Sequence, residues 1–390
     1  MEENKGSVFK TIVSYILVAA LASAATYFTM EGTKEYSKLD ELQELINTCF
    51  IGEVDEKALE DGAAAGMVAG TGDQWSYYIP ASEFGDYMEQ MNNEYVGIGV
   101  TVSQVEDPRG YTVLQVEPGS GAVEAGVLPG DVIYAVDGKL MTDIGFENGA
   151  AAIKGDENTQ VELGIYRGEE TLTLKVTRKK ILVEVAKGEM LEGSIGLVTI
   201  NNFDERCGEE TIAAIEELLA QGAKALIFDV RFNPGGYAKE LTKVLDYILP
   251  AGRIFHTVDY TGKEEFTESD AKCLDIPMAV LMNGSSYSAA EFFAAALDEY
   301  DYAILVGEPT TGKGYFQSTF QLSDGSAVGL SIGKYFTPVQ GRSLAEEGGL
   351  QPEILVELDD ETRANIYGDL VEPKDDPQIQ AAVKALQGNS

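Results

Sequence analysis

The chain has 390 residues and carries 65 acidic against 28 basic side chains, a formal net charge of −37 at pH 7. So acidic a chain is not expected to bind nucleic acid, because phosphate contacts need a basic face. Hydrophobic residues make up 44% of it, too many for a disordered acidic chain, so we expect a globular protein of two or three domains.

Residues 11–30 contain no charged side chain, and Lys5 and Lys10 precede them. As a helix, this segment would span roughly 30 Å, enough to cross a membrane. The charge pattern predicts a cytoplasmic segment over 1–10 and a single-pass signal-anchor over 11–30, with the catalytic part outside the cytoplasm at the cell membrane. The alternative is a signal peptide cleaved near Ala22-Ser23-Ala24, which would give a secreted protein.

A helical neck is predicted over 31–92. Leu39, Leu42, Leu45 and Ile46 follow helical spacing, and the alanine-rich stretch Ala58–Val68 comes after them. We expect this region to connect the membrane segment to the rest of the protein.

Strand-like segments follow over 93–180, near 96–102, 111–116, 132–136, 161–166 and 171–176. Glycines at 97 and 99 would let successive N–H groups converge on one anion, such as the carboxylate of a peptide. The structural alternative is a bulge relieved by glycine. Together with the downstream stretch GSGAVEAGVLPGDVIYAVDGK, the segment resembles a PDZ domain. This resemblance implies that Val96, Gly97, Ile98 and Gly99 bind the free C-terminus of a peptide, which adds as a strand at the sheet edge.

Apolar strands near 196–200, 225–230, 279–282 and 304–306 alternate with helical segments over 181–360. This alternation predicts an α/β layer with a largely parallel sheet. Residues 361–390 form an acidic tail in which a surface helix is expected over Pro377–Leu386.

A phosphate-binding loop is one interpretation of Gly307–Lys313, which fits the pattern G-x-x-x-x-G-K. However, Gly314 stands where that motif needs a magnesium-binding Ser or Thr, and a strand-like segment follows instead of a helix. A nucleotide hydrolase is therefore the third hypothesis, and magnesium-dependent ATP binding would be its signature.

A serine nucleophile with a lysine base is the preferred interpretation. Ser288 is expected at a strand-to-helix turn, where the N–H of Ala289 would point at a developing oxyanion. A buried, neutral Lys313 would accept the serine proton, and Gln317 would orient the lysine amine. The only histidine, His256, lies in an ordinary segment, and we expect it to be structural or on the surface. Three widely spaced cysteines, Cys49, Cys207 and Cys273, indicate neither a disulfide framework nor a zinc site.

The stretches Asp229–Gly236, Asn283–Glu291 and Gly307–Gln317, in this order behind a PDZ-like segment, resemble the C-terminal processing peptidases of serine peptidase family S41. The resemblance implies a crotonase/ClpP-like α/β core with an inserted PDZ domain. It places the catalytic groups on Ser288, Lys313 and Gln317, and the second oxyanion N–H on Gly235 or Gly236. Tyr287 and Ala290 depart from the family pattern, which has small residues or serine there, and Tyr287 would narrow the substrate channel.

The sequence therefore predicts a membrane-tethered serine endopeptidase that needs no cofactor or metal. Its expected substrates are proteins or peptides with free, apolar C-termini, and family resemblance points to a homodimer. The alternative is a catalytically silent envelope scaffold whose PDZ domain binds protein tails.

Overall fold

The structure is a computed structural model that describes residues 37–106, 109–270 and 272–388. The chain divides into two compact units, residues 1–67 and 68–390. The predicted signal-anchor over 11–30 lies outside the described residues. Within the described ranges, no helix combines the length and apolar character needed to cross a bilayer.

The first unit contains helix α2 (Lys38–Cys49) and most of helix α3 (Glu56–Ala69). A capping box starts α2: the Ser37 hydroxyl accepts the Asp40 N–H, and the Asp40 carboxylate accepts the Ser37 N–H. Neither helix buries a residue, and the leucines at 39, 42 and 45 are each about half exposed. Helices thus form in the predicted neck, and their association with a second copy stays a prediction.

The PDZ part is an antiparallel sheet of strand order β3-β4-β5-β7-β8, with the short β6 paired to β5. Strand β3 is therefore an edge strand, as addition of a peptide strand requires. A buried cluster that includes Ile98, Ile133 and Leu163 holds this part together. Its elements are β3 (Val100–Glu106), β4 (Arg109–Val116), α5 (Gly121–Ala125), β5 (Val132–Val136), β6 (Lys139–Leu140), α6 (Met141–Ile144), α7 (Phe146–Ile153), β7 (Gln160–Arg167) and β8 (Glu170–Thr177).

A two-stranded pair connects the PDZ part to the rest of the second unit. Strand β2 (Glu94–Gly97), preceded by α4 (Phe84–Met91), pairs antiparallel with β9 (Lys179–Leu182). The continuous strand expected over 96–102 is wrong, because the chain turns at Ile98 and Gly99 between β2 and β3. The positive φ of Gly99, +76°, makes this turn.

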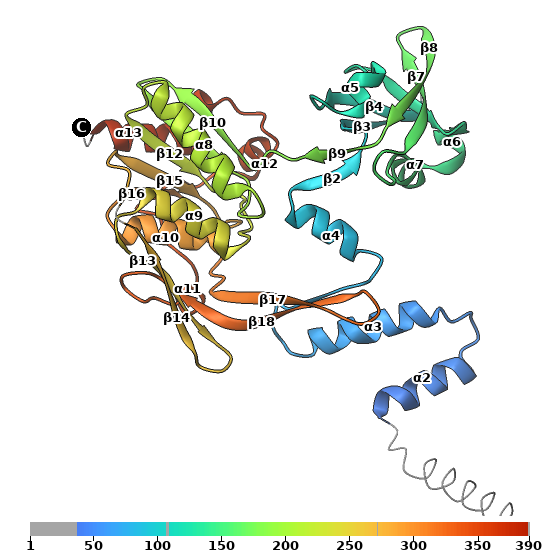
Figure 1. The fold of residues 1–390 in the computed structure, drawn as a ribbon, viewed down its shortest axis with the longest axis horizontal. Coiled ribbons are helices and arrows are strands. Elements are labelled where there is room, and N and C mark those ends of the chain that lie inside the picture. Colours follow the sequence, from blue (N-terminus) through green and yellow to red (C-terminus); the bar gives the residue numbers. More distant parts are fainter. Residues whose placement is uncertain (1–36, 107–108, 271, 389–390) are drawn as a thin grey trace, which may run out of the picture. The chain divides into compact units, whose positions relative to one another are not determined.

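The central sheet has the strand order β10-β11-β12-β15-β16-β19, parallel throughout except for the antiparallel edge strand β10. The predicted largely parallel sheet is therefore confirmed (Figure 1). Its strands are β10 (Ala186–Leu191), β11 (Ile195–Ile200), β12 (Ala225–Asp229), β15 (Met278–Met282), β16 (Ala303–Gly307) and β19 (Ile354–Leu355).

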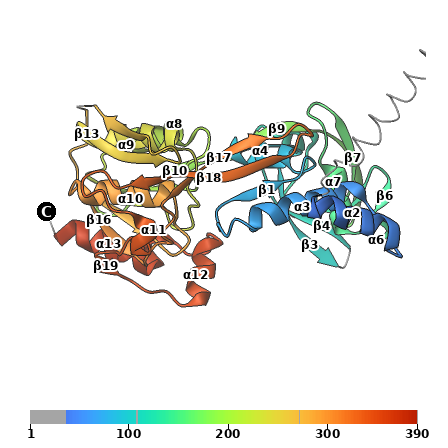
Figure 2. The same ribbon diagram turned by 90° about the horizontal axis from the view of Figure 1, so that it is seen from below.

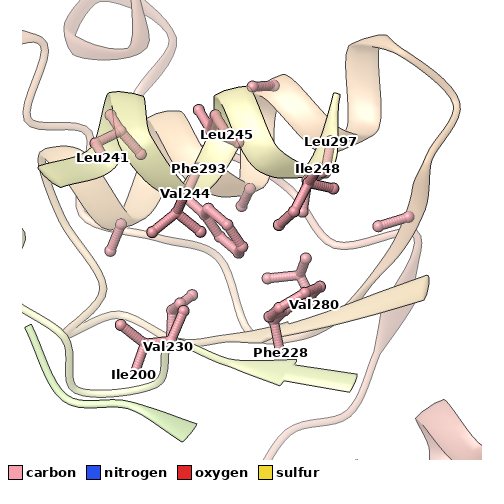
Figure 3. Packing of buried hydrophobic residues seen from close by; sticks show 14 of the residues in the cluster. Ile200, Phe228, Val230, Leu241, Val244, Leu245, Ile248, Val280, Phe293 and Leu297 are labelled. Carbon is pink, nitrogen blue, oxygen red and sulfur yellow. The ribbon is translucent and has the colours of Figure 1, made fainter. Parts of the chain in front are cut away.

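Helices α8 (Cys207–Ala220), α9 (Ala238–Ile248) and α10 (Ala289–Glu299) cover one face of this sheet. Figure 3 shows Val244 and Ile248 of α9 pointing toward Phe228 and Val280 of the strands. Successive side chains of a strand point to opposite faces, so Leu226 and Phe228 belong to this cluster, while Ala225 and Ile227 pack on the other side.

Helix α13 (Pro377–Gly388) covers that second face with one side and exposes Gln380, Lys384 and Gln387 on the other, so the surface helix expected over Pro377–Leu386 is confirmed (Figure 2). Ile379, Ala382 and Leu386 lie on its buried stripe, and the helix contacts β12, β15 and β16. Just before the helix, Asp376 forms a buried ion pair with Arg231. The short helices α11 (Leu344–Glu347), α12 (Asp360–Tyr367) and η1 (Pro373–Asp375) lie in the connections.

A second sheet has the strand order β1-β18-β13-β14, and β17 pairs with β18 (Figure 2). The strand predicted after Lys313 is confirmed as β17. His256 of β13 stacks between the rings of Phe266 and Phe336, which is a structural position. The strands are β1 (Tyr77–Ile79), β13 (Gly252–Asp259), β14 (Glu264–Ser269), β17 (Tyr315–Gln321) and β18 (Ala327–Phe336).

Candidate active site

The three stretches singled out in the sequence follow three neighbouring strands of the central sheet, β12, β15 and β16. Because parallel strands end at the same edge, their C-terminal loops meet there, where ligands bind in α/β folds. Hydrogen bonds join the loops: the Ser286 hydroxyl donates to Val230 O at 2.7 Å, and Thr311 Oγ1 donates to Gly284 O at 2.8 Å. The fold thus assembles the three stretches into one site.

Ser288 occupies the sharp turn between β15 and α10. Its backbone has φ 58° and ψ −123°, a strained conformation for a residue with a side chain, and such strain is concentrated at functional sites. The residue is 9% exposed at the N-terminus of α10. Among the hydrogen bonds of the described residues, none is donated by the N–H of Ala289, so this N–H is open to an oxyanion.

Glu291, in the first turn of α10, connects the loops of Ser288 and Lys313. Its Oε2 atom accepts the N–H of Ser288 at 2.9 Å and that of Lys313 at 2.8 Å. Its Oε1 atom accepts the Thr310 hydroxyl at 2.6 Å and the Gly312 N–H at 2.7 Å. A fully buried carboxylate with four donors is well satisfied, and it fixes both loops at once.

The side chain of Lys313 lies largely out of solvent against aromatic rings. Its Nζ atom is 4.9 Å from the centroid of the Trp75 ring and 5.7 Å from that of Tyr287. Burial lowers the pKa of Lys313, while the nearby carboxylates of Asp73 and Glu291 act in the opposite direction. The net shift is toward the neutral amine, as a general base requires.

No hydrogen bond joins Ser288 Oγ to Lys313 Nζ among those of the described residues, and Gln317 likewise contacts other groups. The Nε2 atom of Gln317 donates to Ser331 Oγ at 3.0 Å and to Tyr315 O at 3.3 Å. Gln317 is therefore anchored to β18, and its predicted role toward the lysine amine remains a prediction.

Gly235 lies next to the nucleophile, since a Cβ atom added to it would fall 2.8 Å from Ser288 Cβ and 2.9 Å from Ala289 N. Its φ of +91° also favours glycine. However, the Gly235 N–H donates to Asn233 Oδ1 at 2.8 Å, so in this conformation it is already engaged. Gly236, next along the chain, pairs with Phe203 in an isolated bridge. The bonds of this bridge use Gly235 O and the Tyr237 N–H, so among the described residues both Gly236 and Ala289 have an N–H that donates no hydrogen bond.

A groove of about 1050 Å³ lies next to this site and shares Asp73 and Trp75 with it. It lies over the part of β18 between the residues paired with β1 and those paired with β13, where the Ser331 N–H donates to Ser76 Oγ and Ile332 O accepts the Tyr260 N–H. Apolar or aromatic and polar side chains line the rest of it in equal number; the apolar or aromatic ones are Val258, Tyr260, Tyr315, Leu330, Ile332 and Phe336.

In the PDZ part, the predicted carboxylate-binding loop has its carbonyl groups occupied. Ile98 O accepts the Ala122 N–H at 2.9 Å, and Gly99 O accepts the Glu117 N–H at 3.0 Å. Within the described residues, no hydrogen bond outside the regular strands uses the N–H of Ile98 or Gly99. The loop, which also includes Val96 and Gly97, leads directly into edge strand β3.

Comparison with known proteins agrees with these features. Residues 194–356 match the model of peptidase family S41, residues 96–177 that of the PDZ domain, and residues 18–82 that of the activating protease CtpB N-terminal domain. The carboxy-terminal processing protease CtpA of Bacillus subtilis (strain 168) is 32% identical over 362 residues, which cover 88% of this chain and 76% of the relative. The chain belongs to peptidase family S41. It is an S41 serine peptidase of the carboxy-terminal processing type, as the motifs predict.

Other relatives of this S41 peptidase are more distant or matched over a shorter length. The chloroplastic carboxyl-terminal-processing peptidase 2 of Arabidopsis thaliana is 32% identical over 287 residues, which cover 70% of this chain and 56% of that protein. A Bacteroides fragilis NCTC 9343 crystal structure ascribed to S41 has a TM-score of 0.53 at 16% identity, covering 87% of this chain and 93% of its own. This second similarity supports the fold alone.

Sequence reasoning missed several residues of the S41 site. Glu291 stood inside a recognised motif, but nothing in the motif assigned it a role as a shared acceptor. Asp73 and Trp75 lie more than 200 residues from Lys313 and came from a segment interpreted only as a neck. The one available signal was that Trp75 is the only tryptophan of the chain.

Proposed function

We propose that this S41 peptidase hydrolyses proteins with a Ser288–Lys313 dyad after its PDZ domain has captured their free C-termini. The neutral amine of Lys313 accepts the Ser288 proton as Oγ attacks the peptide carbonyl. The ammonium then protonates the leaving amine, which departs and leaves an acyl-enzyme on Ser288. Water releases the acyl group, again with the lysine as base.

The observation that carries this proposal is the shared carboxylate of Glu291. It ties the backbone of Ser288 and that of Lys313 to one acceptor, so the nucleophile and a buried amine are held on two sides of the same group. Strain at Ser288 and the free N–H of Ala289 add a poised nucleophile and an oxyanion donor. Gly235 or Gly236 would supply the second donor, and Gly235 would first have to release Asn233.

The dyad is tested by proteolysis of an unfolded protein with an apolar C-terminus, followed by mass spectrometry with the full chain in detergent. Ser288→Ala and Lys313→Ala should each lose at least about a thousandfold in rate. Matched controls are Ser285→Ala in the same loop and Lys224→Ala at the opposite end of β12, and both should keep normal activity. Full activity of either dyad variant would exclude the mechanism.

The acyl-enzyme predicts covalent chemistry on one hydroxyl. A fluorophosphonate probe should label Ser288 of the wild-type protein, with the adduct located by peptide mapping, and labelling should slow strongly in Lys313→Ala. Labelling of a different serine at the same rate would count against Ser288 as nucleophile.

For localisation, we propose a membrane tether over residues 11–30 with the peptidase outside the cytoplasm. The uncharged run and the lysines before it support this proposal. Protease added to intact cells whose outer layers have been made permeable should degrade the peptidase part and leave cytoplasmic markers intact. Protection of the peptidase until the cytoplasmic membrane is lysed would overturn it.

A further inference from the structure

The segment 71–76, which precedes β1, places the ring of Trp75 against the side chain of Lys313, the lysine of the proposed dyad. The rings of Trp75 and Tyr287 lie 5.9 Å apart with an angle of 32° between their planes, and the amine of Lys313 is near the face of both. Among the ion pairs and side-chain hydrogen bonds of the described residues, none involves Lys313 Nζ. The aromatic faces are thus its closest recorded partners.

Asp73 fixes the position of Trp75. One oxygen of its carboxylate accepts the Trp75 N–H at 3.1 Å, and the other accepts the Ser76 hydroxyl at 2.6 Å. Ser76 Oγ in turn accepts the N–H of Ser331, whose hydroxyl receives the Gln317 amide. One continuous set of hydrogen bonds therefore runs from the tryptophan turn to β18 and Gln317.

The charge state of the Lys313 amine depends on opposing effects in this arrangement. Burial disfavours the ammonium form, whereas the carboxylates of Asp73 and Glu291 favour it. The faces of Trp75 and Tyr287 also favour a cation, because their π-electrons attract positive charge. Tyr287 does not itself titrate near neutral pH, since burial raises its pKa.

We propose that Trp75 is a positioning residue of the peptidase reaction: with Tyr287 and Asp73 it holds the amine of Lys313 while the amine is charged, and releases it toward Ser288 when the amine loses its proton. This inference rests on the proposed dyad. Tyr287, which differs from the family pattern, would then help to hold the lysine base. Trp75, which lies outside the S41 motifs, would contribute to the active site.

A fluorescence titration tests the contact without using activity. Trp75 is the only tryptophan, so its emission reports this environment alone. The emission of the full chain should change as Lys313 deprotonates, and Lys313→Met should abolish that transition. Asp73→Asn, which removes a favourable negative charge, should move the midpoint to lower pH. An identical transition in the wild type and Lys313→Met would overturn the proposal.

A second test compares pH profiles of kcat/KM for Trp75→Leu and Trp75→Phe. Leucine keeps the amine shielded from water but has no ring to stabilise the ammonium form, so the pKa of Lys313 should fall and the acid limb of the profile should move down by about one pH unit. Phenylalanine restores a ring, so in Trp75→Phe the acid limb should move down less. Loss of activity in Trp75→Leu with an unmoved acid limb would mean a merely structural role. Failure of the proposed dyad can be told apart from failure of the Trp75 proposal. If Lys313 is not the base, Lys313→Met remains active, whatever the result for the tryptophan variants.

If Trp75→Leu does not fold, Tyr287→Leu keeps the tryptophan probe and removes the second ring. Its fluorescence midpoint should also fall, in the same direction as that of Asp73→Asn. If the fluorescence midpoint is unchanged in both Tyr287→Leu and Asp73→Asn, the rings of Trp75 and Tyr287 do not hold the Lys313 amine, and the proposal is rejected.

Discussion

Glu291 accepts the backbone N–H of Lys313 at 2.8 Å through the same oxygen that accepts the N–H of Ser288. Glu291→Gln replaces one of the two carboxylate oxygens with an NH₂ group, which cannot accept the two hydrogen bonds that this oxygen receives. Because each hydrogen bond to a buried charge contributes roughly 1.5–3 kcal/mol, kcat should fall at least about tenfold even in the folded fraction. Steady-state kinetics, with circular dichroism to measure the folded fraction, checks this.

The matched control for that prediction is Glu240→Gln. Glu240 is equally buried and accepts the Gly208 N–H at 2.9 Å, but it contacts no residue of the proposed dyad. This variant should lose stability while its folded fraction keeps normal kcat. Equal kcat losses in the two variants would show that Glu291 acts through stability alone.

A second prediction concerns the ion pair that holds the C-terminal segment. Arg231 and Asp376 have side chains only 4% and 3% exposed, and their nitrogen and oxygen atoms are 2.8 Å apart. Asp376→Asn should lower the free energy of unfolding by about 1.5–3 kcal/mol, because Arg231 loses one buried counter-charge but keeps its ion pair with Asp229. The exposed pair Asp360–Arg363 provides the comparison: in urea titrations of both variants, Asp360→Asn should leave the free energy of unfolding nearly unchanged.

A third prediction uses Asp204, whose residue is 7% exposed and whose Oδ1 accepts no hydrogen bond from the described residues. Burial raises the pKa of Asp204 to about 7, above its ordinary value of 3.8. Between these values the folded state keeps a proton that the unfolded state loses. This contribution to stability is complete below about pH 4 and is lost as the pH rises through 7, by roughly 1.4 kcal/mol per unit.

Asp204→Asn, which cannot ionise, should therefore lose less stability than the wild type between pH 5 and pH 8. Urea unfolding of both proteins at these two pH values measures the difference. Parallel loss of stability in the two proteins would mean that Asp204 is ionised in the folded state at pH 5.

A fourth prediction concerns the loop of the PDZ domain that we propose to bind a peptide carboxylate. A Cβ atom on Gly99 would lie 2.3 Å from Ser120 Cβ, so Gly99→Ala must distort the loop. Binding of a labelled peptide with a free apolar C-terminus, measured by fluorescence anisotropy, should weaken at least about tenfold. Gly119→Ala has nearly the same φ, +75°, but no atom within 4 Å of its Cβ, and it should bind normally. If Gly99→Ala and Gly119→Ala weaken peptide binding equally, the cause is strain of a non-glycine residue at positive φ and not the clash with Ser120.

The sequence predicted the order of strands and helices in the α/β core well, because β15 is a continuous apolar run between Pro277 and Asn283, and β12 is four apolar residues followed by Asp229. It placed Ser288 at a strand-to-helix turn, and the structure has that turn. Parallel topology then explains why loops far apart in the chain meet at one sheet edge, as Val230 and Ser286 do across 56 residues.

The features that the sequence did not predict depend on contacts between residues that lie far apart in the chain. The apolar stripe of Ile379, Ala382 and Leu386 fits a surface helix with one buried side, but it does not indicate which face of the sheet that side packs against. Likewise, spacing relates Gln317 to Lys313, but the hydroxyl of Ser331 competes for its amide. Contacts of this kind depend on tertiary packing, and local periodicity carries no information about them.

Strands β2 and β9 place the entrance and the exit of the PDZ insertion beside each other, with Gly97 opposite Lys179. An antiparallel pair of this kind can be closed by a two-residue hairpin. A short turn could thus replace some eighty residues without stretching the scaffold on either side. A different domain with adjacent ends could therefore be carried between the same two strands, while the central sheet and its loops keep their positions.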